Sequence, residues 1–311
     1  MVLNIVLIIV GVALVLWGAD RMTDGAVAIA QRLNIPPIVI GLTIVAMGTS
    51  MPEFCVSLVS ALKGTADLAI GNVVGSNIMN VLLIVGITAM VSPMVISKST
   101  VKKDIPWAVV AALLLGYFCF DNLLSRFEAL VLFVLFLAFI CYTLWSAKKG
   151  KVTENEEVKK KYTPLMAIGL VLLGLVCLIL GSNIFVDAAT KVAASLGVSE
   201  AVIGLTIVAG GTSLPELATS VVAARKGQSA IAIGNVIGSN VFNILMIVGI
   251  TGLICPLKMP NITIIDLSLM VLSIILLWFF TYTKYKVERW EGAFLFIILI
   301  GYMWWLIASA D

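Results

Sequence analysis

Two short motifs place a carboxylate inside an apolar stretch. Residues 48–53 read Gly-Thr-Ser-Met-Pro-Glu and residues 211–216 read Gly-Thr-Ser-Leu-Pro-Glu, each within an apolar run long enough to cross a membrane. Proline lacks a backbone N–H and clashes with the carbonyl four residues earlier, so each helix should break or kink near Gly48 and Gly211. A charged carboxylate at the bilayer centre costs on the order of 3 kcal/mol, which makes Glu53 and Glu216 candidates for a functional site.

Hydroxyl and amide side chains recur at helical spacing around these carboxylates. The hydroxyls three and four residues before each glutamate lie on the same helix face as its side chain. They belong to Thr49, Ser50, Thr212 and Ser213. The next predicted helix in each half carries Asn, Ser and Asn four residues apart, which forms one polar stripe. The stripe residues are Asn72, Ser76, Asn80, Asn235, Ser239 and Asn243. Taken singly, such side chains also serve as hydrogen-bonding contacts between membrane helices.

The chemistry of this set is that of hard oxygen ligands. Carboxylates, hydroxyls, amides and the carbonyls freed by a helix break suit Ca²⁺, which accepts six to eight oxygens in flexible geometry, or Na⁺. Mg²⁺ fits less well because it resists dehydration and requires a strict octahedron. Two carboxylates neutralise one Ca²⁺ at low dielectric. After Ca²⁺ leaves, the same carboxylates need Na⁺ or protons, which is a physical basis for ion exchange.

Other kinds of site fit the residues less well. A structural ion pair would need a basic residue in the interior of the four motif-bearing helices, and there is none. The chain has no histidine, so neither an imidazole ligand nor a Ser–His pair for nucleophilic catalysis is present. We therefore expect no enzymatic activity and no cofactor. A passive cation channel and a Ca²⁺/H⁺ antiporter remain as alternatives.

The composition points to a multi-pass membrane protein. Of the 311 residues, 61% are hydrophobic and 12% are charged, which excludes an ordinary soluble domain. Apolar segments of about 18 to 25 residues alternate with short polar stretches, the length a helix needs to span the hydrocarbon. We expect an all-α fold with ten spans, near residues 2–19, 37–62, 67–91, 104–121, 125–146, 164–181, 200–224, 230–254, 262–283 and 289–308. The five cysteines lie in or beside apolar segments without a Cys-x-x-Cys pair and are interpreted as packing residues.

An internal repeat with a constant offset of 163 residues organises the chain. Residues 41–93 align without gaps on residues 204–256, with 32 of 53 positions identical. The chain therefore divides into a first five-helix repeat at 1–146, a short linker at 147–163 and a second repeat at 164–311. Because five is odd, the second repeat should cross the membrane in the opposite sense. Inverted repeats with interrupted helices at matching places indicate a secondary transporter whose site lies at the midplane.

Basic residues predict the orientation. With both termini outside, 16 of the 20 Lys and Arg residues fall on the cytoplasmic side, together with the linker at 147–163. We expect a multi-pass protein of the cell membrane with that orientation. Asp24 and Asp187 occupy equivalent positions near the predicted end of the first helix in each repeat, where we expect capping or interfacial roles.

With these motifs in hand, the chain resembles the Ca²⁺/cation antiporter superfamily, and most closely its prokaryotic sodium/calcium exchangers. The paired Gly-Thr-Ser-x-Pro-Glu and Gly-Asn-x-x-Gly-Ser-Asn-x-x-Asn blocks match the alpha-repeats of that family, and the resemblance covers the whole chain. It implies ten helices in inverted repeats and exchange of Ca²⁺ for Na⁺ by alternating access. It also implies that the first and sixth helices slide against an ion-binding core made by the second, third, seventh and eighth.

The resemblance also implies a set of ion ligands. By motif position, Glu53 and Glu216 are the central Ca²⁺ ligands. The motif hydroxyls, Ser76, Ser239 and the carbonyls of Ala46 and Ala209 complete the Ca²⁺ and Na⁺ sites, and Asn80 and Asn243 close the set. Potassium-dependent relatives carry aspartate at one of these last positions, so two asparagines argue against K⁺ dependence. The linker is too short for the Ca²⁺-sensing region of animal exchangers. We expect Ca²⁺, Na⁺ and the bilayer as partners, with no nucleic acid and no obligatory protein partner.

Overall fold

Helices account for nearly all of the chain. The computed structural model describes residues 1–149, 162–197, 209–259 and 262–310. Within these ranges seven helices are long and apolar enough to cross a membrane, and one bent pair makes an eighth. These seven helices and the bent pair begin and end within a few residues of the predicted bounds, except at the first and the sixth predicted spans, and the predicted span at 104–121 is not among them. The start of the predicted span at 200–224 falls on residues 198–208, and most of the linker on residues 150–161, outside the described residues.

Two interrupted helices form the centre of the bundle. One consists of α5 (Ala66–Met79), the π-helical segment η2 (Asn80–Val85) and α6 (Gly86–Val91). The other consists of α13 (Ser229–Val241), η5 (Phe242–Val248) and α14 (Gly249–Ile254). In each, 78% of the apolar membrane-spanning stretch is buried inside the protein, whereas the corresponding share for the first helix is 22%. Small and polar residues suit this position because they let neighbouring helix backbones approach closely.

The helices that carry the proline motifs are broken where the sequence predicts. The first runs through α2 (Pro37–Ile40), η1 (Gly41–Val45) and α3 (Ala46–Thr49), and α4 (Met51–Leu62) follows at an angle of 47°. Its counterpart consists of α11 (Ala209–Thr212) and α12 (Leu214–Arg225). The residue at each break, Ser50 or Ser213, leaves the helical conformation with ψ near zero.

Four further helices pack around this centre. They are α7 (Ile105–Phe118), which continues from the π-helical η3 (Thr100–Asp104), α8 (Arg126–Lys149), α15 (Ile264–Lys284) and α16 (Arg289–Ala310). The all-α prediction omitted two small antiparallel ribbons at the helix ends. In one, β1 (Met94–Val95) pairs with β4 (Lys286–Val287), and in the other β2 (Leu123–Leu124) pairs with β3 (Leu257–Lys258).

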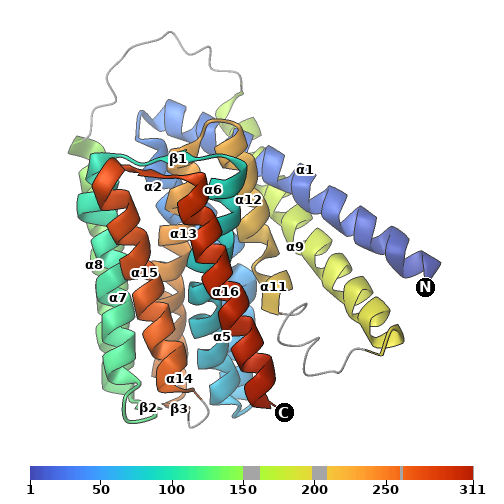
Figure 1. Cartoon of the computed structure of the whole chain (residues 1–311). Coiled ribbons are helices and arrows are strands. Elements are labelled where there is room, and N and C mark those ends of the chain that lie inside the picture. The colour runs from blue at the N-terminus through green and yellow to red at the C-terminus, as the bar shows by residue number, and fades with distance from the viewer. Residues whose placement is uncertain (150–161, 198–208, 260–261, 311) are drawn as a thin grey trace.

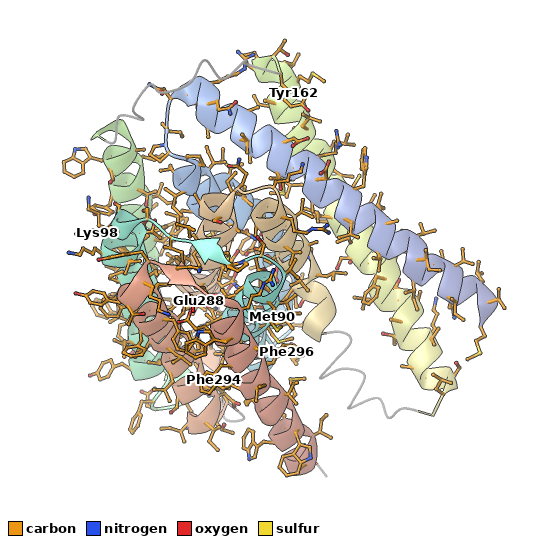
Figure 2. All side chains as sticks on the ribbon, turned by 45° about the horizontal axis from the view of Figure 1, so that its top comes forward. Met90, Lys98, Tyr162, Glu288, Phe294 and Phe296 are labelled. Atoms are coloured by element: carbon orange, nitrogen blue, oxygen red, sulfur yellow. The ribbon has the colours of Figure 1, made fainter. Side chains whose placement is uncertain are left out.

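The helices α1 (Val2–Leu33) and α9 (Pro164–Ser195) form a long pair at the side of the bundle (Figure 1). Both are 32 residues long, so the predicted bounds of 2–19 and 164–181 were too short. The predicted end fell at the charged residues after position 19, but no proline follows there, and the helix continues through Gly25 to Leu33 before Asn34 caps it in the left-handed conformation. Near that end Arg32 donates to the carbonyl of Tyr162 at 2.8 Å. Tyr162 lies just before the start of α9 (Figure 2).

Glycines bring α1 and α9 into direct backbone contact. A Cβ on Gly11 would lie 2.8 Å from the carbonyl oxygen of Gly181, and a Cβ on Gly18 would lie 2.8 Å from that of Gly174. The two helices are therefore antiparallel, and larger side chains at these positions would separate them. Because the offset of 163 relates Gly11 to Gly174 and Gly18 to Gly181, the two contacts are the same contact made twice.

Other contacts across the molecule are reciprocal in the same sense. Gly86 on α6 lies against Phe296 on α16, and Gly249 on α14 lies against Phe133 on α8. By the offset of 163, Gly86 is equivalent to Gly249 and Phe296 to Phe133, so the two contacts are equivalent. The two ribbons are equivalent in the same way. The offset relates β1 to β3 and β2 to β4, so the β1–β4 pair corresponds to the β3–β2 pair. Each contact made by one repeat on the other therefore has an equivalent contact in the reverse direction, as expected for an approximate two-fold axis.

Candidate functional site

The two helix breaks place the candidate carboxylates at helix N-termini. Glu53 lies in the first turn of α4 and Glu216 in the first turn of α12, each after a proline at the second helical position. The positive end of a helix dipole stabilises a negative charge there. Both side chains are 1% exposed, and none of the ion pairs among the described residues includes either of them. The carboxylates are buried without a basic partner in the described structure.

Direct contacts bring the two breaks together. The Ser50 hydroxyl donates a hydrogen bond to Oε1 of Glu216 at 3.2 Å, and the Thr49 hydroxyl lies 3.1 Å from Oδ1 of Asn235. These residues are far apart in the sequence and belong to different motif copies. The two glutamates also interact electrostatically with one another. The expectation that the copies jointly form one polar centre is consistent with these contacts.

Asparagines on the central helices support the backbone beneath each carboxylate. Nδ2 of Asn72 donates to the carbonyl of Glu53 at 3.1 Å and to the hydroxyl of Ser57 at 2.9 Å. In the second copy Nδ2 of Asn235 makes the equivalent bonds to the carbonyl of Glu216, at 3.3 Å, and to the hydroxyl of Ser220, at 3.1 Å. The amide nitrogens therefore act as interhelical contacts, which leaves only the Oδ1 atoms as possible cation ligands.

Ser57 and Ser220 were missed when the site was interpreted from the sequence. Each stands four residues after its glutamate, which puts it on the same helix face. Each hydroxyl also donates to a carbonyl on the next helix, that of Ala69 at 3.2 Å or Ala232 at 3.5 Å. The i to i+4 spacing from the carboxylate was the available signal, but a serine at that spacing is too common to single out.

Several buried polar atoms around the carboxylates lack a hydrogen-bond partner within the described structure. They are Oε2 of Glu53, Oε2 of Glu216, the hydroxyls of Ser213, Thr219 and Ser239, and both amide atoms of Asn243. Leaving a buried polar group unsatisfied costs about 1–3 kcal/mol, so a cluster of them needs a physical reason. Most are oxygens with lone pairs to offer, and the centre carries two carboxylates. A bound cation would satisfy the oxygens among them.

The remaining predicted ligands lie around this centre in different settings. Nδ2 of Asn80 donates to Oδ1 of Asn240 at 2.9 Å, so this amide pairs across the copies. The carbonyl of Ala46 accepts from the Thr49 hydroxyl at 3.3 Å. Ala209 begins α11, and its side chain lies outside the described part. Asn80 begins η2 and Asn243 lies within η5, and single-turn π segments of this kind occur frequently at functional sites.

A cavity of about 520 Å³ lies beside the polar centre. Helices α4, α5, α15 and α16 supply most of its walls, and Thr212 of α11 contributes as well. Asn72 and Ser76 of α5 also line it. Among the predicted site residues, these three therefore border open space, whereas Glu53 and Glu216 are enclosed.

Asp24 does not occupy the position expected for it. Because α1 continues to Leu33, Asp24 lies inside the helix rather than at its end, and it forms an ion pair with Lys226 at the end of α12. The Asp24–Lys226 ion pair could not be predicted, because residues so far apart in the sequence show no local pattern that links them. Asp187, its equivalent on α9, is exposed.

Comparisons with known proteins identify the family of the chain. The family model described as sodium/calcium exchanger protein matches residues 3–145 and, at an offset of 163, residues 166–308. CaxA of Alkalimonas amylolytica, named as a candidate antiporter, is 39% identical over 99% of this chain and 100% of its own. Sodium/calcium exchanger MaX1 of Methanosarcina acetivorans is 33% identical over 96% of this chain and 97% of its own. The sodium-calcium exchanger NCX_Mj, in a structure soaked with Na⁺ and Ca²⁺, matches with a TM-score of 0.83 and 32% identity over 97% of this chain and 98% of that one.

Proposed function

Because this chain belongs to the sodium/calcium exchanger protein family, and is thus a multi-pass cation transporter and not an enzyme, we propose that it exchanges Ca²⁺ for Na⁺. One observation carries the proposal. Two buried carboxylates, Glu53 and Glu216, meet at matched helix breaks, and each has an oxygen without a partner in the described structure. Their two charges balance one Ca²⁺, and Na⁺ replaces that charge when Ca²⁺ leaves.

The proposed ligands are the predicted site residues. Glu53 and Glu216 bind Ca²⁺ directly, and neighbouring hydroxyls and carbonyls complete the Ca²⁺ and Na⁺ sites. These neighbours are Thr49, Ser50, Thr212, Ser213, Ser76, Ser239, Ala46 and Ala209. The amides of Asn72, Asn80, Asn235 and Asn243 close the set through their Oδ1 atoms, because an amide nitrogen donates hydrogen bonds and does not coordinate a cation. The unpartnered oxygens of Ser213 and Ser239 support this assignment.

The proposed architecture is ten helices in two inverted repeats, at 1–146 and 164–311, joined by the linker at 147–163. The reciprocal contacts of α1 with α9, of β1 with β4 and of β2 with β3 support an approximate two-fold axis between the halves. Since α1 and α9 are antiparallel, such an axis runs across the helices, which is the geometry that inverts one repeat relative to the other.

The proposed orientation places both termini outside the cell membrane and the linker in the cytoplasm, as the distribution of basic residues indicates. The cavity beside α5 then lies on the route between the outside and the polar centre. Thr212, Asn72 and Ser76 line it, so a cation that enters the cavity meets their oxygens.

The counter-ion is the part of the proposal most open to test, because a Ca²⁺/H⁺ antiporter is the alternative. The neutral Asn80 and Asn243 carry no titratable proton, which favours Na⁺ over H⁺. Purified protein in proteoliposomes should accumulate Ca²⁺ when a Na⁺ gradient is imposed and should accumulate none when a pH gradient alone is imposed. Accumulation driven by the pH gradient alone would favour proton coupling. Dissipation of gradients without any opposing accumulation would indicate a channel.

A further inference from the structure

Away from the polar centre, one lysine connects the α1–α9 pair to the core. Nζ of Lys226, at the end of α12, lies 2.6 Å from Oδ1 of Asp20 and 2.7 Å from Oδ1 of Asp24, both on α1. It also donates to the carbonyl of Asp20 at 3.2 Å. Between 24% and 31% of each of the three side chains is exposed, so solvent screens this cluster only in part.

The charges of this cluster are matched. Burial acts to lower the pKa of Lys226, but the hydrogen bonds and charges of Asp20 and Asp24 outweigh it and raise the pKa above its ordinary value. The ammonium therefore stays charged at any physiological pH. Arg21 pairs with Asp20 at 2.6 Å and lies over the ring of Trp17. These contacts hold the guanidinium of Arg21 beside the ammonium of Lys226.

The repeat supplies an equivalent pair at the other end of the molecule. The offset of 163 relates Lys226 to Lys63, at the end of α4, and Asp24 to Asp187, on α9. Both Lys63 and Asp187 are exposed, and neither forms an ion pair within the described residues. The same two positions are thus paired in one repeat and separated in the other.

Helix packing differs between the repeats in the same way. α1 packs along α12, whereas α9 makes little contact with the equivalent helix α4. The glycine contacts hold α1 and α9 together, so the pair is built to move as one body against the core. If the repeats exchange their conformations, α9 comes to lie on α4 as α1 now lies on α12.

We propose that Lys226 with Asp20 and Asp24, and Lys63 with Asp187, are two alternating latches between the α1–α9 pair and the core. The proposal rests on the alternating access of the proposed function. In the conformation described here the Lys226 latch is closed and the Lys63 latch is open. Movement of α1 and α9 releases Lys226 and brings Asp187 onto Lys63, so one set of ion pairs replaces the other and the two states stay close in free energy.

The two latches are unequal. Asp20 corresponds to Asn183 on α9, so Lys63 has one carboxylate to engage where Lys226 has two. The latches by themselves therefore favour the conformation described here. Replacing Asn183 with aspartate adds the missing carboxylate and should shift the population toward the opposite state.

Cross-linking tests the alternation directly. In full-length protein with its five native cysteines replaced by alanine, one variant carries Asp24→Cys with Lys226→Cys, a second carries Lys63→Cys with Asp187→Cys, and a third carries all four. A short bifunctional thiol reagent should link each pair in its own variant and arrest exchange until the reagent is reduced. In the four-cysteine variant either link should prevent the other. Both links in one molecule, or no link between positions 63 and 187, would overturn the proposal.

A charge exchange supplies the complementary measurement. Lys63→Glu should slow turnover at least threefold with little change in Ca²⁺ affinity, and adding Asp187→Lys should restore the rate. Lys98→Glu, at an exposed lysine outside both latches, is the matched control. Slow turnover that Asp187→Lys leaves unrestored would contradict the latch. Formation of the links does not depend on which ions are transported. If the links exclude one another in a protein that fails to exchange Na⁺ for Ca²⁺, the proposed function is wrong and the latch proposal still holds.

Discussion

The hydroxyl of Ser50 donates a hydrogen bond to the carboxylate of Glu216 at 3.2 Å, across the two copies of the repeat. The equivalent hydroxyl, Ser213, has no partner within the described structure, and neither does Oε2 of Glu53. One sequence motif thus adopts two hydrogen-bonding states within one molecule. A bound cation would remove the difference, because it could accept lone pairs from the unpartnered oxygens of both copies.

The Ser50 hydroxyl should contribute measurably to ion binding. Ser50→Ala removes a proposed hydroxyl ligand beside Glu216; if that contact is worth about 1.5–3 kcal/mol, as for a hydrogen bond to a charged group, Ca²⁺ binding should weaken by roughly 10- to 100-fold. The measurement is a Ca²⁺ titration of purified protein. Ser273→Ala is the control, because that buried hydroxyl donates only to Met270 in its own helix. Equal affinities in the two variants would remove Ser50 from the site.

The serines beneath the carboxylates should affect stability more than affinity. Ser57→Ala and Ser220→Ala each remove the partner of a supporting asparagine, at a cost of about 1 kcal/mol. We expect a lower thermal unfolding temperature in detergent, with Ca²⁺ affinity within about threefold of the unsubstituted protein. A variant that unfolds at the unchanged temperature but fails to bind Ca²⁺ would show that the serine is itself a ligand.

Close contact between α1 and α9 should depend on glycine at the crossing points. Gly174→Val should disrupt the pair and abolish exchange, because a Cβ there would lie 2.7 Å from the carbonyl oxygen of Gly18. Gly169→Val on the same helix is the matched control, since a Cβ at that position meets no atom within 4 Å. Transport assays and size-exclusion profiles of both variants give the comparison. Full activity in Gly174→Val would refute the tight pair.

Residue accessibility should reveal the orientation. In a cysteine-free background, Lys258→Cys should react with a membrane-impermeant maleimide in intact cells, whereas Lys98→Cys should react only after permeabilisation. Both side chains are exposed, and they adjoin different ribbons, Lys258 in β3 and Lys98 after β1. The reverse pattern of labelling would place the termini in the cytoplasm.

Much of this site could be anticipated because its determinants are local. The proline in each motif predicts the helix break, and the spacing to Glu53 and Glu216 predicts that hydroxyls share their helix face. The repeat predicts that the copies act together. Contacts between distant segments have no such signature. Asp24 was expected near the end of the first helix, yet Lys226, about 200 residues later, balances the charge of Asp20 and Asp24 within a continuous α1.

The difference between the repeats could not be anticipated for another reason. Two similar sequences predict two similar structures, whereas Lys226 forms ion pairs and Lys63 forms none within the described residues. Such asymmetry belongs to one conformation of the whole molecule, in which α1 lies on α12 and α9 lies away from α4. A repeat in the sequence fixes the set of contacts available to both halves but leaves open which half makes them.

The central claim is that Glu53 and Glu216 form one shared Ca²⁺ site. The most direct test is equilibrium binding of Ca²⁺ to the purified protein, to Glu53→Gln and to Glu216→Gln, each in the absence and presence of Na⁺. We predict one Ca²⁺ per chain, displaced by Na⁺, and at least a 100-fold loss of affinity in either variant alone, because one remaining carboxylate leaves the buried charge unbalanced. Ca²⁺ binding of undiminished affinity in either folded variant would contradict the shared site.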